Sequence, residues 1–211
     1  MYAEDVHRPT GGRIKWGMET LFPPTVTAAD IPPLPGLRYL PAYIAEAEER
    51  VLAAAIDAMP WDTEWQRRRQ PYGAGYGRKG TAPPIPDWGR RLADRLLADG
   101  VTAEPFDQML VNEYLPGQGI SLHRDYAPFG RTVVSLSLLS PCVMDFRLAP
   151  SGRKESLLLE PRSLLVLEGE ARYDWEHGIA SRKRDAWHGL PVERGRRLSV
   201  TFRFRAAGAR S

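Results

Sequence analysis

The chain is poor in cysteine and histidine and has no long apolar run. Cys142 is the single cysteine among 211 residues, which excludes an internal disulfide and a zinc site built from cysteines. No apolar run approaches the roughly 18 residues that a membrane span needs. Residues 1–5 lack the charged and then apolar pattern of a secretory signal. We therefore expect a cytoplasmic protein that does not associate with membranes.

An excess of one charge is also lacking overall, although basic residues gather locally. The 29 basic and 26 acidic side chains give a net charge of +3, which is mild. Residues 66–80, by contrast, contain Arg67, Arg68, Arg69, Arg78 and Lys79 and no acidic residue. A local basic segment can hold phosphates, so nucleic acid is a candidate partner. A solvated surface loop is the alternative interpretation of the same segment.

The length predicts one domain with an N-terminal extension. Residues 1–36 are rich in proline, glycine and threonine and predict an irregular arm, followed by a single domain over 37–211. Apolar residues at helical spacing predict helices over 41–59 and 86–98, with Asp87 and Gly100 as the caps of the second. Between them, residues 61–84 form a basic, aromatic and glycine-rich loop, which at this length is expected to be functional or disordered.

After residue 107 the pattern changes to short, β-rich segments separated by turns. The predicted strands are 108–115, 131–139, 142–148, 155–160, 163–168, 171–175 and 197–205. Two helices followed by these strands indicate a mostly β fold of the α+β type, either a sandwich or a jelly roll with helices packed on one side.

The last predicted strand alternates clearly between apolar and polar residues. One face carries Leu198, Val200, Phe202 and Phe204, and the other carries Arg197, Ser199, Thr201, Arg203 and Arg205. A row of arginines on an inner sheet face would be costly unless the arginines met anions. An exposed outer face is the alternative.

The chain has four histidines, and two of them stand in patterns typical of metal ligands. In an extended segment His123 and Asp125 point the same way, so an imidazole and a carboxylate converge. A further histidine would complete the set of two histidines and one carboxylate that holds non-haem Fe(II) and leaves positions open. That histidine is either His177, directly after a predicted strand, or His188, in a basic loop. A hydrogen-bonded surface pair is the alternative for His123 and Asp125.

Four motifs in order resemble the AlkB family of Fe(II)/2-oxoglutarate dioxygenases. Residues 112–117 read N-x-Y-x-P-G, 123–125 read H-x-D, 177–179 read H-G-I, and 197–203 read R-x5-R. The similarity covers about 107–205 and extends weakly back to about 37. Segments 133–138, 144–146 and 177–183 are also similar to the branch that includes the tRNA wobble-uridine hydroxylase.

The resemblance implies a double-stranded β-helix, the jelly roll, and a set of site residues. His123, Asp125 and His177 would bind Fe(II). Arg197 would pair with the far carboxylate of 2-oxoglutarate, and Arg203 would lie nearer the metal and hold the cosubstrate or the ligand carboxylate. The remaining cosubstrate contacts would be Asn112, Tyr114, Ser199 and Thr201. The implied reaction uses O2, releases succinate and CO2, and demethylates, dealkylates or hydroxylates nucleobases in DNA or RNA, as in alkylation repair.

The loop over 61–84 resembles the nucleotide-recognition lid of AlkB proteins. Its aromatic and basic residues would stack on an unpaired base and hold phosphates, and the residues concerned are Trp65, Arg67, Arg69, Tyr72 and Tyr76. The implied partner is DNA or RNA that is single-stranded or has a flipped base, bound by a monomer. A packed Trp65 with solvated arginines is the alternative.

Two positions depart from the founding repair enzyme of the family. Ala127 stands where that enzyme has a second acid that contacts the base, and Ser156 replaces an arginine. The base preference is therefore expected to differ. Two other functions remain open, namely the same oxidation of a protein side chain or small molecule, and a non-catalytic nucleic-acid-binding jelly roll.

Overall fold

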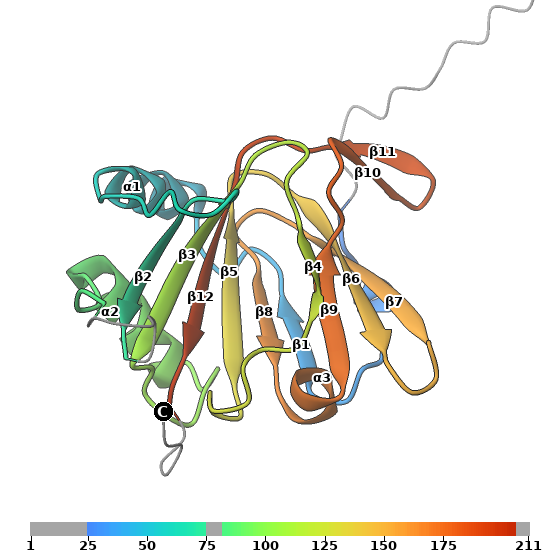
Figure 1. Cartoon of the computed structure of the whole chain (residues 1–211), viewed down its shortest axis with the longest axis horizontal. Coiled ribbons are helices and arrows are strands. Elements are labelled where there is room, and N and C mark those ends of the chain that lie inside the picture. Colours follow the sequence, from blue (N-terminus) through green and yellow to red (C-terminus); the bar gives the residue numbers. More distant parts are fainter. Residues whose placement is uncertain (1–24, 75–81, 206–211) are drawn as a thin grey trace, which may run out of the picture.

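Two antiparallel β-sheets pack face to face, and helices cover the outside of one of them (Figure 1). The computed structural model describes residues 25–74 and 82–205. Every strand pair within the sheets is antiparallel, and strands distant in sequence are neighbours in space. This arrangement confirms the predicted jelly roll.

The larger sheet has six strands in the order β1-β8-β5-β12-β3-β2. Their bounds are β1 Leu37–Leu40, β8 Leu164–Leu167, β5 Val133–Leu138, β12 Arg197–Arg203, β3 Gln108–Tyr114 and β2 Arg69–Gly73. Strand β12 lies between β5 and β3, so every residue of this strand is buried. The polar face of the last predicted strand is therefore an inner face.

The smaller sheet has four strands in the order β4-β9-β6-β7. Their bounds are β4 Ile120–His123, β9 Trp175–Ile179, β6 Cys142–Leu148 and β7 Lys154–Leu159. A separate hairpin, β10 Arg184–Trp187 with β11 Leu190–Glu193, follows β9 in the chain.

Two helices, α1 (Glu46–Asp57) and α2 (Asp87–Ala98), cover the outer face of the larger sheet (Figure 1). Leu52 and Ile56 of α1, with Leu92 and Leu96 of α2, join the apolar face of β12 in one buried cluster. Acidic residues in the first turn of α1 favour its N-terminus. Asp87 is the first helical residue of α2 rather than its cap, and Gly100 follows the helix in the left-handed region, as predicted.

A second apolar cluster fills much of the space between the two sheets. It includes Phe146 and Leu157 from the smaller sheet and Val133 and Leu165 from the larger. Leu34, within the predicted arm, is buried in the same cluster, next to a short 3₁₀ helix, η1 (Ala28–Asp30). Several members of this cluster, among them Val133 and Leu165, also line the cavity into which the inward-facing polar side chains point.

The prediction of a strand over 171–175 is wrong. Residues Gly169–Tyr173 form a short helix, α3, which begins at a glycine with a φ of 48° and contains good helix formers. The strand follows it, so His177 lies within β9 rather than after a strand.

Several strands escaped prediction because they are short and lack clear alternation. These are β1, β2, β4, β10 and β11. Strand β2 lies within the loop predicted over 61–84, where its residues pair with β3. No helix among the described residues is long and apolar enough to cross a membrane.

Candidate active site

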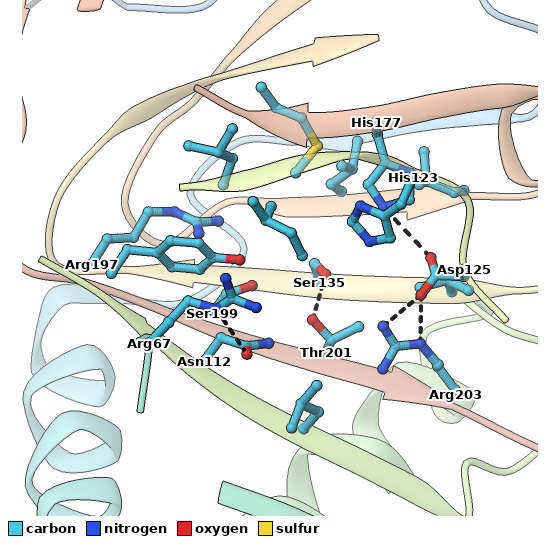
Figure 2. Close-up of a pocket in the computed structure, with 18 residues that line it drawn as sticks. Arg67, Asn112, His123, Asp125, Ser135, His177, Arg197, Ser199, Thr201 and Arg203 are labelled. Atoms are coloured by element: carbon cyan, nitrogen blue, oxygen red, sulfur yellow. Dashed lines mark hydrogen bonds and ion pairs between the residues drawn. The ribbon is translucent and has the colours of Figure 1, made fainter. Parts of the chain in front are cut away.

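A cavity between the two sheets has polar side chains at both ends (Figure 2). One end carries His123, Asp125 and His177, and the other carries Arg197 and Asn112. Strands β3, β4, β5, β9 and β12 all contribute to its walls. The cavity therefore brings together residues from four of the motifs seen in the sequence.

Strand pairing places the two imidazoles beside each other. His123 ends β4 and is the direct register partner of His177 on β9, and their ring centroids lie 4.6 Å apart. Asp125 follows two residues later, with its Oδ2 3.6 Å from Nε2 of His177. Two imidazoles and one carboxylate thus lie together at this end of the cavity.

Among the described residues, no hydrogen-bond donor occupies Nε2 of His123 or Oδ2 of Asp125 at this end of the cavity. Nδ1 of His123 lies 2.9 Å from the carbonyl oxygen of Ser121, so this nitrogen donates its proton and Nε2 keeps a lone pair. Oδ2 of Asp125 is buried without a hydrogen-bond partner. A buried carboxylate oxygen without a donor is costly, and a bound cation would satisfy it.

The protonation states also suit a cation. Burial, which disfavours the charged imidazole, lowers the pKa of His177 to about 4, so the ring is neutral at physiological pH. Burial by itself raises the pKa of Asp125, but Arg203 and His177 outweigh it and lower this pKa to about 2. The site therefore offers a neutral imidazole at His177 and an ionised carboxylate at Asp125, the protonation states that metal binding requires.

A buried arginine holds the backbone of the loop that carries Asp125. Arg172 of α3 is 2% exposed and donates to the carbonyl oxygens of Asp125 at 3.1 Å, Tyr126 at 2.9 Å and Phe129 at 3.4 Å. These bonds satisfy backbone acceptors where the chain leaves β4. The loop position is thereby set by a residue far away in the sequence.

Gly178 allows the close approach of β4 and β9. A Cβ at this position would lie 2.8 Å from the carbonyl oxygen of Ile120 and 2.9 Å from the backbone nitrogen of Leu122, closer than real contacts allow. Because these atoms belong to the strand that carries His123, a larger residue would push the two imidazoles apart. This gives the physical reason for a glycine after His177.

The other end of the cavity contains an arginine that lacks partners for most of its donors. Nη2 of Arg197 donates to Oγ of Ser137 at 2.8 Å, whereas its Nε and Nη1 are buried and have no hydrogen-bond partner within 25–74 and 82–205. Unsatisfied buried donors on a charged group are expensive. An anionic group in the cavity would satisfy them, and a carboxylate fits the planar guanidinium.

The wall between the two ends comes from the antiparallel pairing of β12 with β3. Arg197 is the register partner of Tyr114, and Ser199 is that of Asn112, so their side chains share the inner face. Thr201 lies further along and its hydroxyl is 2.8 Å from that of Ser135. The predicted cosubstrate residues thus line one continuous surface.

Arg203 lies at the end of the cavity that carries His123, Asp125 and His177. Its Nε and Nη2 both donate to Oδ1 of Asp125, at 2.8 and 2.5 Å. The structure thus brings it to the ligand carboxylate, one of the two positions that the resemblance left open. The cation-binding end and the unsatisfied Arg197 together fit Fe(II) and a dicarboxylate such as 2-oxoglutarate.

Tyr72 does not lie where the sequence analysis expected. It is 2% exposed, packs in the cluster beneath the helices, and donates its hydroxyl hydrogen to Gln70. The prediction that it stacks on a base is wrong for this arrangement, because alternation along β2 turns it away from the cavity. Tyr76 lies outside the described residues.

The three consecutive arginines of the lid have partners within the protein. Arg68 pairs with the buried Glu113 and lies over the ring of Trp61 at 4.4 Å. Arg69 pairs with Asp62 at 2.9 Å and lies 4.7 Å from the ring of the 61% exposed Trp65.

Arg67 turns into the cavity instead of toward the surface. Its expected role as a phosphate contact is therefore wrong for this arrangement, because its donors reach Asn112 and the carbonyl oxygen of Gly119.

His188 is not brought to the site. It lies in the turn between β10 and β11, its side chain is 60% exposed, and its Nε2 is 2.7 Å from Oδ1 of Asp30. His123, Asp125 and His177 line the cavity and His188 does not. The choice that the sequence left open is thus decided by strand pairing.

Sequence reasoning missed Arg172 and Ser137. No local pattern marks Arg172, because its partners are backbone atoms of a remote loop. Ser137 was identifiable, since Ser135 and Ser137 alternate with apolar residues along 133–138 and such alternation indicates one polar face.

Comparison with known proteins gives one family and several relatives. Residues 36–203 match the model described as the 2OG-Fe(II) oxygenase superfamily. The "Probable RNA/DNA demethylase ALKBH6" of Danio rerio is 32% identical over 162 residues, covering 69% of this chain and 69% of that protein. Among solved structures, that of OsALKBH1 has a TM-score of 0.62 at 18% identity and covers 80% of this chain and 97% of the other.

Two further relatives are longer than this chain. The "Alkylated DNA repair protein ALKBH8 homolog" of Arabidopsis thaliana is 35% identical over an alignment of 201 positions that covers 81% of this chain and 58% of that protein. The "tRNA (carboxymethyluridine(34)-5-O)-methyltransferase ALKBH8" of Macaca fascicularis is 36% identical over an alignment of 170 positions that covers 72% of this chain and 25% of that protein. The similarity thus covers part of each of these proteins.

Proposed function

The chain belongs to the 2OG-Fe(II) oxygenase superfamily and, within it, to the AlkB family, and we propose that it oxidises modified nucleobases in single-stranded DNA or RNA. Membership makes it a dioxygenase that uses Fe(II), 2-oxoglutarate and O2. One observation carries the proposal. At one end of the cavity, Oδ2 of Asp125 lies beside His177 and has no hydrogen-bond donor among the described residues. At the other end, Arg197 has unsatisfied donors.

The residues of the cavity divide the work between its two ends. His123, Asp125 and His177 would hold the iron, and Arg203 keeps the carboxylate of Asp125 in orientation. Arg197 would hold the distal carboxylate of 2-oxoglutarate with the donors that are now unsatisfied. When bound, Fe(II) and 2-oxoglutarate supply oxidation of a C–H bond by O2, with succinate and CO2 as the other products.

Apolar side chains around the cavity exclude water and fix the cosubstrate between the two ends. These side chains come from both sheets: Leu110, Ile120, Val133, Met144, Leu165, Leu167 and Ile179. The protein thus supplies positioning and a dry cavity, and the cofactors supply the oxidation.

The nucleobase substrate is supported by the lid and by the relatives. Trp65 exposes a large aromatic surface on the lid, and an exposed indole can stack on an unpaired base. Arg69, which lies against this indole, would bring positive charge toward a phosphate. The names of two relatives refer to DNA repair and to RNA/DNA demethylation.

The test is a panel of methylated and etheno-modified oligonucleotides, in both DNA and RNA, incubated with Fe(II), 2-oxoglutarate and O2. We expect product mass and succinate to appear together for at least one member. Succinate without any modified-base product would favour a protein or small-molecule substrate. Absence of 2-oxoglutarate turnover under all conditions would instead indicate a non-catalytic module.

A tRNA wobble uridine is a second candidate substrate. Two ALKBH8 relatives match most of this chain, and Ala127 removes the second acid found in the founding repair enzyme. The chain spans 25% of the macaque methyltransferase, and the candidate reaction is hydroxylation of the uridine. An anticodon stem-loop with a modified uridine, scored for a mass gain of one oxygen atom, separates hydroxylation from demethylation.

A further inference from the structure

Arg67 extends from the lid into the cosubstrate end of the cavity. Its Nε lies 3.2 Å from Oδ1 of Asn112, and its Nη1 lies 2.9 Å from the carbonyl oxygen of Gly119. Figure 2 shows its guanidinium beside Asn112 and Ser199, on the side of the cavity where Arg197 lies. Arg67 is therefore part of the cavity wall, although it belongs to the lid segment.

Arg67 and Arg197 converge on the ring of Tyr114. Their guanidinium carbons lie 4.9 and 5.3 Å from its centroid. Neither arginine has a carboxylate partner in the described part of the chain, whereas Arg68 and Arg203 each have one. Two guanidinium groups that line one partly buried cavity without a carboxylate partner raise its free energy through mutual repulsion and lost hydration. A dianionic ligand with one carboxylate between them would turn this repulsion into attraction.

Arg67 also determines how Asn112 presents its amide. A guanidinium has donors and no acceptor, so the atom of Asn112 that faces Arg67 must be the amide oxygen. The amide NH2 of Asn112, which lines the cavity, is then the group left to donate to a ligand. Arg67 thus prepares a neutral donor next to its own positive charge.

We propose that Arg67 is the second arginine of the 2-oxoglutarate site, where it shares the distal carboxylate with Arg197 and orients Asn112 toward it. This inference rests on the proposed function, because it concerns the same cosubstrate. It assigns to one lid arginine a task different from gripping the nucleic acid. Consequently the lid contributes directly to the cosubstrate site.

The experiment measures ligand binding to the Mn(II)-loaded full chain by anaerobic calorimetry. The ligands are 2-oxoglutarate and 2-oxopentanoate, which has the same chain length and lacks the distal carboxylate. We expect Arg67→Gln to weaken 2-oxoglutarate about tenfold or more, the loss of one charge-assisted contact, and to change 2-oxopentanoate less than about twofold. Arg67→Lys, which keeps the charge and loses the fork, should fall between wild type and Arg67→Gln.

Arg68→Gln is the matched control, because Arg68 anchors the same segment through Glu113 without lining the cavity. It should leave the preference for 2-oxoglutarate over 2-oxopentanoate unchanged. Equal losses for both ligands in Arg67→Gln, no loss, or the same loss in Arg68→Gln would overturn the inference. Circular dichroism checks that each variant folds, and Arg67→Lys carries the test if Arg67→Gln does not.

Arg197→Gln separates this inference from the proposed function. Suppose that the wild type binds 2-oxoglutarate and that Arg197→Gln weakens this binding. An unchanged affinity of Arg67→Gln for 2-oxoglutarate would then refute only the role of Arg67. If the wild type fails to bind 2-oxoglutarate at all, the proposed function itself fails.

Discussion

Arg203 donates two hydrogen bonds to a single oxygen of Asp125. Its Nε and Nη2 lie 2.8 and 2.5 Å from Oδ1, while Oδ2 faces His177 without a donor. The guanidinium thus occupies one side of the carboxylate and leaves the other side for a cation. Because the fork has a fixed shape, it sets the plane of the carboxylate as well as its charge.

Replacing Arg203 by lysine should weaken metal binding while the protein stays folded. Lysine keeps the positive charge but loses the two-point contact, so the carboxylate can rotate. We expect the affinity for Mn(II) to fall about tenfold, as for other residues that orient metal ligands. Electron paramagnetic resonance titration measures it. Arg131→Lys, at an exposed arginine paired with Glu104, is the control, and an unchanged affinity in Arg203→Lys would contradict this role.

His177→Ala should weaken metal binding strongly, whereas His188→Ala should leave it almost unchanged. His177 faces Asp125 in the cavity, so its loss should weaken Mn(II) or Co(II) binding more than about 100-fold, beyond the effect of losing an outer contact. His188 is exposed and faces Asp30, so its loss should have less than about a twofold effect. A Co(II) absorption titration distinguishes them, and the reverse result would place the metal elsewhere.

Arg172→Met should destabilise the fold. Three backbone carbonyl oxygens would lose their donor at a buried position, and unsatisfied buried acceptors cost about 1–3 kcal/mol each, only partly additively. We expect a decrease of about 2–4 kcal/mol in the free energy of unfolding, measured by urea denaturation. Arg50→Met, at an exposed pair with Glu46, should change it by less than about 0.5 kcal/mol. Equal stability of the two variants would refute the role of Arg172.

Stability should fall in acid through Asp185. Burial by itself raises its pKa, but Arg194 and the backbone N–H of Val143 outweigh burial and hold this pKa below its usual value of 3.8. A group with a depressed pKa contributes stability above its unfolded pKa and loses it as the pH falls through the folded pKa. The free energy of unfolding should therefore decrease below about pH 4.

Asp185→Asn tests this contribution directly. The variant should lose about 3 kcal/mol at neutral pH, because the buried guanidinium of Arg194 loses its counter-charge. Its stability should also depend less on pH in the acid range than that of the wild type. Urea denaturation between about pH 3 and 7 measures both effects. Parallel pH profiles for the two proteins would show that another group causes the acid loss.

Local pattern predicted much of the fold. Both helices and most strands after residue 107 were identifiable, because periodicity and turn residues act over a few neighbouring positions. The prediction of a strand over 171–175 was wrong because a short helix and a short strand differ little in composition. Strand β2 was missed because its pairing with β3, rather than its own sequence, makes it a strand.

The sequence also predicted several residues of the candidate site, but not all of their contacts. Alternation placed Arg197 and Arg203 on one face, and the motifs marked His123 and Asp125. The contacts of the lid arginines were not predictable, since Arg67, Arg68 and Arg69 are adjacent in sequence but meet Asn112, Glu113 and Asp62 respectively. Each partner depends on which way the backbone turns at that residue.

The sequence by itself determined which chemical groups are available for binding and catalysis. It also determined that side chains at positions i and i+2 of a strand share a face, because the backbone of a strand repeats every two residues. The tertiary structure alone decided that the polar face of β12 points inward, that His177 rather than His188 joins His123, and that Arg67 enters the cavity. These choices depend on the register between strands distant in the chain, which is fixed only when the sheets pair and bury their apolar faces.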